Sequence, residues 1–100
     1  NGEFTLVNAA QETIAQVTVS ICAREFQFGP LRPGESGAAS YRIDRDDGFK
    51  VRATFVSGRT VSKEDGYVTT GMSFRHRIAV TDAGITVTEG RERTEGSARD

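Results

Sequence analysis

The side chains of this chain that could do chemistry are few and lie far apart in the sequence. His76 is the only histidine and Cys22 the only cysteine. A histidine that acts as a general base needs a nucleophile and an orienting carboxylate beside it, and no serine or cysteine stands in a nucleophile-elbow motif. His76 falls in phase with apolar residues of one segment. We therefore interpret it as a structural histidine at the rim of an apolar face, and we predict no catalytic residues and no enzyme activity.

Cys22 falls on the same strand face as Thr18 and Ser20, with Arg24 two residues further on. A nearby positive charge lowers the pKa of a thiol and makes it reactive, but one arginine is a weak indication. We interpret Cys22 as a small, unreactive thiol. A single cysteine excludes a disulfide within the chain, and a disulfide between chains stays open if the protein is exported.

Asp44, Asp46 and Asp47 precede Gly48 and look like part of a calcium loop. Their spacing departs from the EF-hand pattern, in which glycine is the sixth residue of a longer run that ends in glutamate. Aspartates before glycine also form turns by accepting bonds from their own backbone. We predict a turn here, with no metal and no cofactor.

Basic residues recur at the outward positions of several predicted strands: Arg42, Lys50, Arg52, Arg75 and Arg77. If the strands that begin at Phe49 and Phe74 lie in one sheet, these side chains form a basic face that could hold an acidic glycan or an anionic protein. The alternative is ordinary cross-strand pairing with acidic neighbours.

Tyr67 and Met72 lie in a glycine-flanked stretch that reads as a loop. Both are candidates for contact with a partner. Tyr67 fits equally a core position with its hydroxyl tied to the backbone, as in the tyrosine corner, and we favour this second interpretation.

The elements that must position these residues are strands. Apolar and polar residues alternate strictly from Phe49 to Phe55, which is typical of a strand with one dry and one wet face. The same alternation and the turn signals predict strands at 4–7, 14–22, 26–28, 39–43, 49–56, 59–61, 67–69, 74–81 and 85–88. Turns are expected at 23–25, 33–34, 44–48, 57–58, 65–66 and 82–84.

Seven to nine short strands with regular turns predict an all-β fold, an antiparallel two-sheet sandwich of the immunoglobulin-like kind. One hundred residues suffice for one domain, which we place at 1–89, followed by a disordered tail at 90–100. Thirteen basic and fourteen acidic residues nearly cancel, so no attraction to nucleic acid is expected. No apolar run in the sequence is long enough to span a membrane.

The stretch from Phe26 to Ser36 resembles the corner of bacterial immunoglobulin-like modules. There a leucine, Leu31 in this chain, packs inward, and a Pro-Gly-Glu-Ser turn precedes the next strand. The segment from Gly66 to Met72 is similar to one in small exported bacterial sandwich proteins of unknown function. The resemblance covers the pattern of residues 4–89. It implies an architecture and no functional residues, since the Cys-Trp-Cys core of antibody domains is absent.

From these observations we predict a non-enzymatic accessory or protein-binding domain of a bacterial protein. It would act through a sheet edge, a loop or the basic sheet face, on a protein partner or as a homodimer joined by an edge strand. The alternative is a domain with a pocket near His76 that binds, or acts on, a small molecule or carbohydrate. We expect a periplasmic or extracellular location, because such sandwiches are common outside the cytoplasm.

Overall fold

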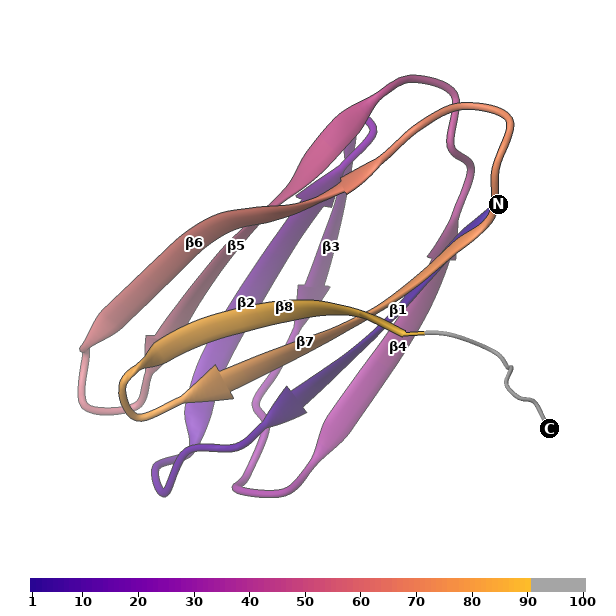
Figure 1. Cartoon of the computed structure of the whole chain (residues 1–100). Helices are drawn as coiled ribbons and strands as arrows, with labels where there is room; N and C mark the ends of the chain where they lie inside the picture. Colours follow the sequence, from indigo (N-terminus) through magenta and orange to yellow (C-terminus); the bar gives the residue numbers. More distant parts are fainter. Residues whose placement is uncertain (91–100) are drawn as a thin grey trace, which may run out of the picture.

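The computed structural model describes residues 1–90. Of the tail predicted at 90–100, Gly90 ends the last strand, and residues 91–100 lie outside the described residues. The described chain forms eight strands and no helix (Figure 1). The strands are β1 (Gly2–Asn8), β2 (Ile14–Ile21), β3 (Arg24–Phe28), β4 (Ser36–Tyr41), β5 (Asp47–Phe55), β6 (Thr60–Val68), β7 (Phe74–Thr81) and β8 (Gly84–Gly90). These eight strands confirm the all-β prediction. Residues 1–90 hold no helix long and apolar enough to cross a membrane.

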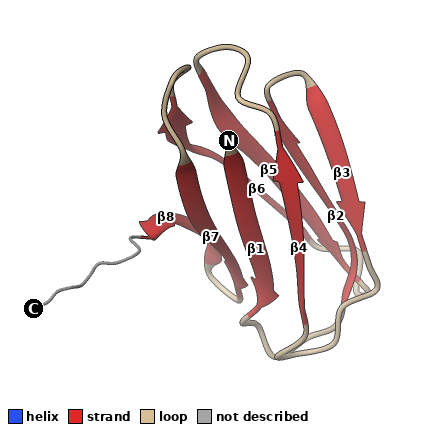
Figure 2. Ribbon diagram, turned by 90° about the vertical axis from the view of Figure 1, so that its right-hand side faces the viewer, coloured by secondary structure: helices blue, strands red, loops and turns tan. Residues whose placement is uncertain are grey.

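The strands form two four-stranded sheets, in the orders β4-β1-β7-β8 and β3-β2-β5-β6 (Figure 2). Strand β1 lies inside its sheet, antiparallel to β4 and parallel to β7. The two-sheet sandwich predicted from the sequence is present, but the prediction that it is antiparallel throughout is wrong, because β1 and β7 run parallel. Its immunoglobulin-like topology is not confirmed, because an antibody domain places its first strand beside its second, whereas here β1 and β2 lie in different sheets.

The predicted alternation on β5 is confirmed. The inward side chains are buried and at most 2% exposed, whereas Lys50 and Arg52 between them are exposed; the buried set is Phe49, Val51, Ala53 and Phe55. Burying apolar side chains on one face of each sheet gives the core that holds the two layers together.

The two sheets meet around the ring of Phe4 on β1. Its centroid lies 5.5 Å from Phe26 and 5.9 Å from Phe28 on β3, and 5.8 Å from Phe49 on β5. These three contacts are edge-to-face, the arrangement that aromatic quadrupoles favour. Tyr41 on β4 completes the cluster at 6.3 Å. One side chain of the first sheet therefore contacts both an edge and a central strand of the second.

Strand β6 differs from the prediction, which placed two short strands on either side of a turn at Asp65-Gly66. The strand is continuous, and Gly66 is an extra residue in its ladder with β5, because Phe49 pairs with Asp65 and Gly48 with Tyr67. Gly66 has φ +76°, which only glycine adopts easily. The Asp-Gly pair is thus a bulge inside a strand, not a chain reversal.

The hairpin of β2 and β3 is confirmed, but its turn comes earlier than predicted. Ile21 pairs with Arg24, so the loop is Cys22-Ala23, and both residues have positive φ, 50° and 61°. A two-residue loop of this kind matches the twist of the flanking strands and usually carries asparagine and glycine. Here a carboxylate oxygen of Asp47 accepts the backbone N–H of Cys22 at 2.7 Å and stabilises the turn.

Asn8, at the end of β1, is a buried polar residue whose role the sequence did not reveal. Its side-chain amide donates to the carbonyls of Leu31 (2.9 Å) and Glu12 (3.0 Å), and its side-chain oxygen accepts the N–H of Ala10 (2.9 Å). Asn8 thus ties the strand end to two loops. Leu31 is buried, with 8% of its surface exposed.

We expect Gly66→Ala to destabilise the domain more than Gly58→Ala. Both glycines have positive φ, which costs alanine about 1 kcal/mol, but an added Cβ at Gly58 meets open space. At Gly66 it would lie 3.1 Å from Phe49 and 3.0 Å from Val87, and such overpacking costs about 1–3 kcal/mol more. Urea unfolding of the two variants measures the difference. Equal losses would contradict the packed bulge.

We expect Asn8→Ala to lower the free energy of unfolding by about 3 kcal/mol, because it leaves buried backbone groups unpaired. A suitable control is Gln16→Ala, which removes an exposed side-chain bond to Gln27 at 3.1 Å and should cost less than about 0.5 kcal/mol. Thermal and urea unfolding give both values. A small effect at Asn8 would show that water replaces its hydrogen bonds.

Candidate functional site

The predicted basic face does not form, because its members lie on different layers. Lys50 and Arg52 point outward from β5 in one sheet, whereas Arg75 and Arg77 point outward from β7 in the other. A single basic patch required β5 and β7 to lie in the same sheet, and they lie in different sheets. The fifth member, Arg42, directly follows β4 at the edge of the sandwich.

Arg75 supports the alternative of cross-strand pairing. Its guanidinium lies 3.4 Å from the carboxylate of Glu3, its register partner on β1. Both side chains are about half exposed, so the pair contributes little stability. Lys50 lies opposite Glu64 on β6, and Arg52 opposite Ser62. These basic residues therefore lie on two solvated sheet faces with polar neighbours beside them.

His76 lies on the apolar face of β7, as its phase indicated, but inside the sandwich and not at the rim. Its side chain is 2% exposed, and its ring packs 4.9 Å from Phe49 and 6.0 Å from Phe74. Its Nδ1 has no hydrogen-bond partner among the described residues. Burial lowers the pKa of His76 below the usual 6.5, and the charge of Glu89 opposes this shift weakly. The imidazole is thus a neutral core side chain near neutral pH.

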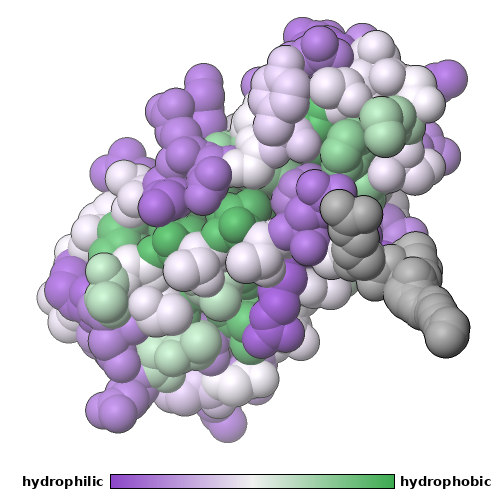
Figure 3. All heavy atoms as spheres, viewed as in Figure 1, coloured by the Kyte–Doolittle hydropathy of each residue, from purple (hydrophilic) through white to green (hydrophobic). Residues whose placement is uncertain are grey.

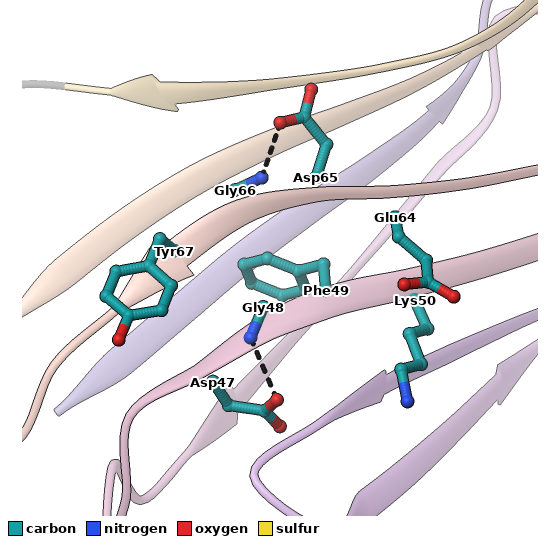
Figure 4. A pocket seen from close by; sticks show the side chains of 8 residues that line it. All are labelled: Asp47, Gly48, Phe49, Lys50, Glu64, Asp65, Gly66 and Tyr67. Atoms are coloured by element: carbon teal, nitrogen blue, oxygen red, sulfur yellow. Dashed lines mark hydrogen bonds between the residues drawn. The ribbon is translucent and has the colours of Figure 1, made fainter.

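The alternative of a ligand pocket around His76 finds no opening at that residue. The best-defined surface hollows of the described residues have volumes of about 360 to 560 Å³, and His76 lines none of them. One of about 500 Å³ lies over Gly48 and Gly66 on β5 and β6 (Figure 4). The backbone of Gly66 separates this hollow from the imidazole of His76. A Cβ added to Gly66 would lie 3.5 Å from Cδ2 of that ring.

Two of the three carboxylates around that hollow, Asp47 and Asp65, accept hydrogen bonds from the backbone, and the third is Glu64. Asp47 accepts the N–H of Gly48 at 2.9 Å, and Asp65 that of Gly66 at 2.8 Å, as the dashed lines in Figure 4 show. Each carboxylate thus fixes the glycine that follows it. Such pairing explains the acidic residues here as supports of the bulge.

The three aspartates of the predicted turn also have separate partners. Asp44 contacts Arg45 at 3.0 Å, which lowers the pKa of that carboxyl, and Asp46 accepts the N–H of Thr70 at 3.1 Å. Asp47 accepts the N–H of Cys22. Among residues 1–90, no group of three or more acidic, histidine or cysteine side chains is placed to hold a metal ion. Residues 42–46 form the loop before β5, whereas Asp47 and Gly48, which the sequence placed in the turn, already belong to that strand.

Cys22 lies in the hairpin turn, not on the strand face where we placed it. Its side chain is 1% exposed, and its Sγ lies 3.5 Å from the carbonyl of Arg45. The burial agrees with an unreactive thiol and leaves no surface for a disulfide between chains.

Tyr67 is not a core residue, so the interpretation that we favoured is wrong. Its side chain is 60% exposed and projects from β6, whereas its neighbour Val68 is fully buried. Met72, in the loop between β6 and β7, is also 60% exposed. The buried tyrosine is Tyr41, whose hydroxyl has no partner among the described residues and whose pKa burial raises to about 12. Tyr67 and Met72 stay candidates for contact.

The feature that stands out is strand β4, at the edge of its sheet (Figure 2). Its sequence, Ser-Gly-Ala-Ala-Ser-Tyr, has no charge and no proline. An edge strand exposes unpaired backbone N–H and C=O groups, and proteins usually protect such edges with lysine, proline, bulges or inward-pointing charges. Strand β4 has none of these protections.

The other three edges are protected. Strand β6 has the bulge and the charged residues Lys63 and Asp65 on the side of the strand that faces inward. Strand β8 lies against β6, so each covers the free edge of the other (Figure 1). An apolar strip shows between them, rimmed by hydrophilic side chains (Figure 3). Strand β3 is only five residues long and begins with Arg24 and Glu25.

The sequence reasoning treated the β4 segment as an ordinary strand at 39–43 and missed the site. The signal that could have revealed it is the uncharged run from Ser36 to Tyr41, in a chain of which 27% is charged. At its far end, Tyr41, Arg42 and Arg24 border a shallow hollow of about 560 Å³.

The similarity of this chain to known proteins concerns its fold alone. No family model and no curated protein matches the chain. A solved structure titled "NMR structure of the protein from Eubacterium rectale" is similar, with a TM-score of 0.64 and 17% sequence identity. The match covers 93% of this chain and 91% of that one. The two proteins therefore share an all-β sandwich architecture over nearly their whole lengths.

We expect the domain to lose stability as the pH falls from 7.5 to 5.5. The unfolded chain protonates His76 at its ordinary pKa of 6.5, whereas the folded domain holds this pKa lower, so acid favours the unfolded state. The loss begins as the pH falls through 6.5 and ends at the pKa of the folded state. Because His76 is the only histidine, urea unfolding at the two pH values should show a smaller change in His76→Gln. The same change in both proteins would contradict a buried neutral imidazole.

Proposed function

We propose that this chain is a non-enzymatic accessory or protein-binding domain that takes an extended segment of a partner onto the free edge of β4. The observation that carries the proposal is the six-residue edge strand without charge, proline or bulge. A segment that pairs there gains backbone hydrogen bonds along its length.

The surroundings of β4 support this role. Its outward residues Ser36, Ala38 and Ser40 are exposed and small, so they leave an added strand free to approach. Side chains pack closely against the inward side of β4. The ring of Tyr41 lies across Gly2, and the ring of Phe28 lies so close to Gly37 that an added Cβ there would be 2.7 Å from it. A rigid strand with its hydrogen-bonding edge free is preorganised for pairing, which reduces the entropy cost of binding.

Two further expectations of the same role are not tested by these observations. A periplasmic or extracellular location stays a prediction, and so does the absence of enzyme activity. The proposal needs the two-sheet sandwich and the free edge, and it does not depend on an immunoglobulin-like topology.

We expect a short synthetic peptide of alternating threonine and valine to bind along β4. Binding should shift the amide resonances of residues 36–41 and slow their hydrogen exchange. Ala38→Lys places a long charged side chain at the middle of the edge and should weaken binding roughly tenfold or more. Ser62→Lys, at an exposed outward position of β6, is the matched control and should bind like the parent protein.

The proposal fails if the peptide shifts amides on β6 or β8 instead of β4, or if Ala38→Lys binds as well as Ser62→Lys. Thermal unfolding of both variants checks that the added lysine leaves the sandwich folded.

A further inference from the structure

We infer that the extended segment which fits β4 is β4 of a second copy of this chain, paired antiparallel about a two-fold axis. This inference rests on the proposed role of β4 as a docking edge. Two observations select this occupant: the symmetry of the strand's sequence and the opposite charges at its two ends.

The sequence of β4 matches its own reverse closely. With Ala38 on the two-fold axis, Ser36 of each copy lies opposite Ser40 of the other, and Gly37 lies opposite Ala39. Residues that face each other across antiparallel strands point to the same side of the sheet. The pairing keeps the exposed residues outward and the inward ones inward, and brings only small side chains together.

The charges beyond the two ends of β4 are complementary. Glu35 comes directly before the strand and Arg42 directly after it, and both are exposed. In the antiparallel pair, Glu35 of one copy lies opposite Tyr41 of the other, one residue from its Arg42. The two-fold axis repeats this proximity, so an acidic and a basic side chain lie near each other at each end of the shared ladder.

Arg42 is available for such a pair, since it forms no ion pair within residues 1–90. Arg24 lines the same hollow as Arg42, but its charge already interacts with the carboxylate of Asp44. The side chain of Glu35 accepts the N–H of Arg32 at 2.7 Å with one oxygen. Its second oxygen is left for a partner.

Such a dimer is closed, because each copy uses its unprotected edge and neither offers another. The sheet β4-β1-β7-β8 of one copy joins the same sheet of the other copy, which gives one sheet of eight strands. Pairing six-residue strands buries less than the ~1,000 Å² typical of stable interfaces, so we expect a weak dimer with a dissociation constant of roughly 10 μM to 1 mM.

Sedimentation equilibrium over a range of concentrations tests the inference. Arg42→Glu and Glu35→Arg should each weaken the dimer roughly tenfold, because each brings like charges together, and the double variant should restore it. Glu35→Gln keeps an acceptor for Arg32 and removes only the charge, so it should weaken the dimer without disturbing the turn. Arg77→Glu, on the outer face of β7, is the control and should leave the dimer unchanged.

Recovery of the dimer in the double variant, together with a monomeric Ala38→Lys, would support the inference. A dimer that Ala38→Lys leaves intact, or single charge changes without effect, would overturn it. A chain that stays monomeric at millimolar concentration while β4 still binds the threonine-valine peptide would overturn the inference and leave the proposed function standing. A monomer that binds no peptide would overturn both.

Discussion

The contact on which the sandwich depends is the insertion of Phe4 among the aromatic rings of both sheets. Phe4 belongs to β1, an inner strand of the first sheet, and it meets Phe26 and Phe28 from the edge of the second sheet and Phe49 from its centre. Because Phe4 is 1% exposed, its whole side chain contributes to burial. The same cluster holds Tyr41, and through it strand β4. The edge that we propose as the docking site is therefore anchored to this aromatic cluster.

Local patterns predicted the strands well, because alternation reports directly which side chains face the core. The apolar positions of β5 and β7 and the Pro33-Gly34 turn follow from residue types alone. The turn closes with a bond from the N–H of Glu35 to the carbonyl of Arg32 at 2.9 Å, and Gly34 has the positive φ it requires. What the pattern could not provide was the neighbour of each strand. The basic face failed for this reason, since β5 and β7 have the same alternation and lie in different sheets.

Two further errors have local physical causes. An Asp-Gly pair favours both a hairpin turn and a glycine bulge, and only the pairing with β5 shows that Gly66 is a bulge. The extra residue reverses the alternation of β6, so Tyr67 points outward where the unbroken pattern placed it inside. The Cys22-Ala23 turn lacks the usual asparagine and glycine, and its support comes from Asp47, 25 residues away. Interactions over such distances along the chain leave no signal in a short window of sequence.

The parallel pairing of β1 with β7 has a consequence for how the domain forms during synthesis. Phe4 pairs with Ala39 on one side and with His76 on the other, so β1 lacks its partner β7 until most of the chain has left the ribosome. Contacts between residues so distant in sequence make folding slow, because the intervening chain must be ordered before they form. During that delay the apolar face of β1 is only partly covered, so contacts between unfolded chains compete with folding.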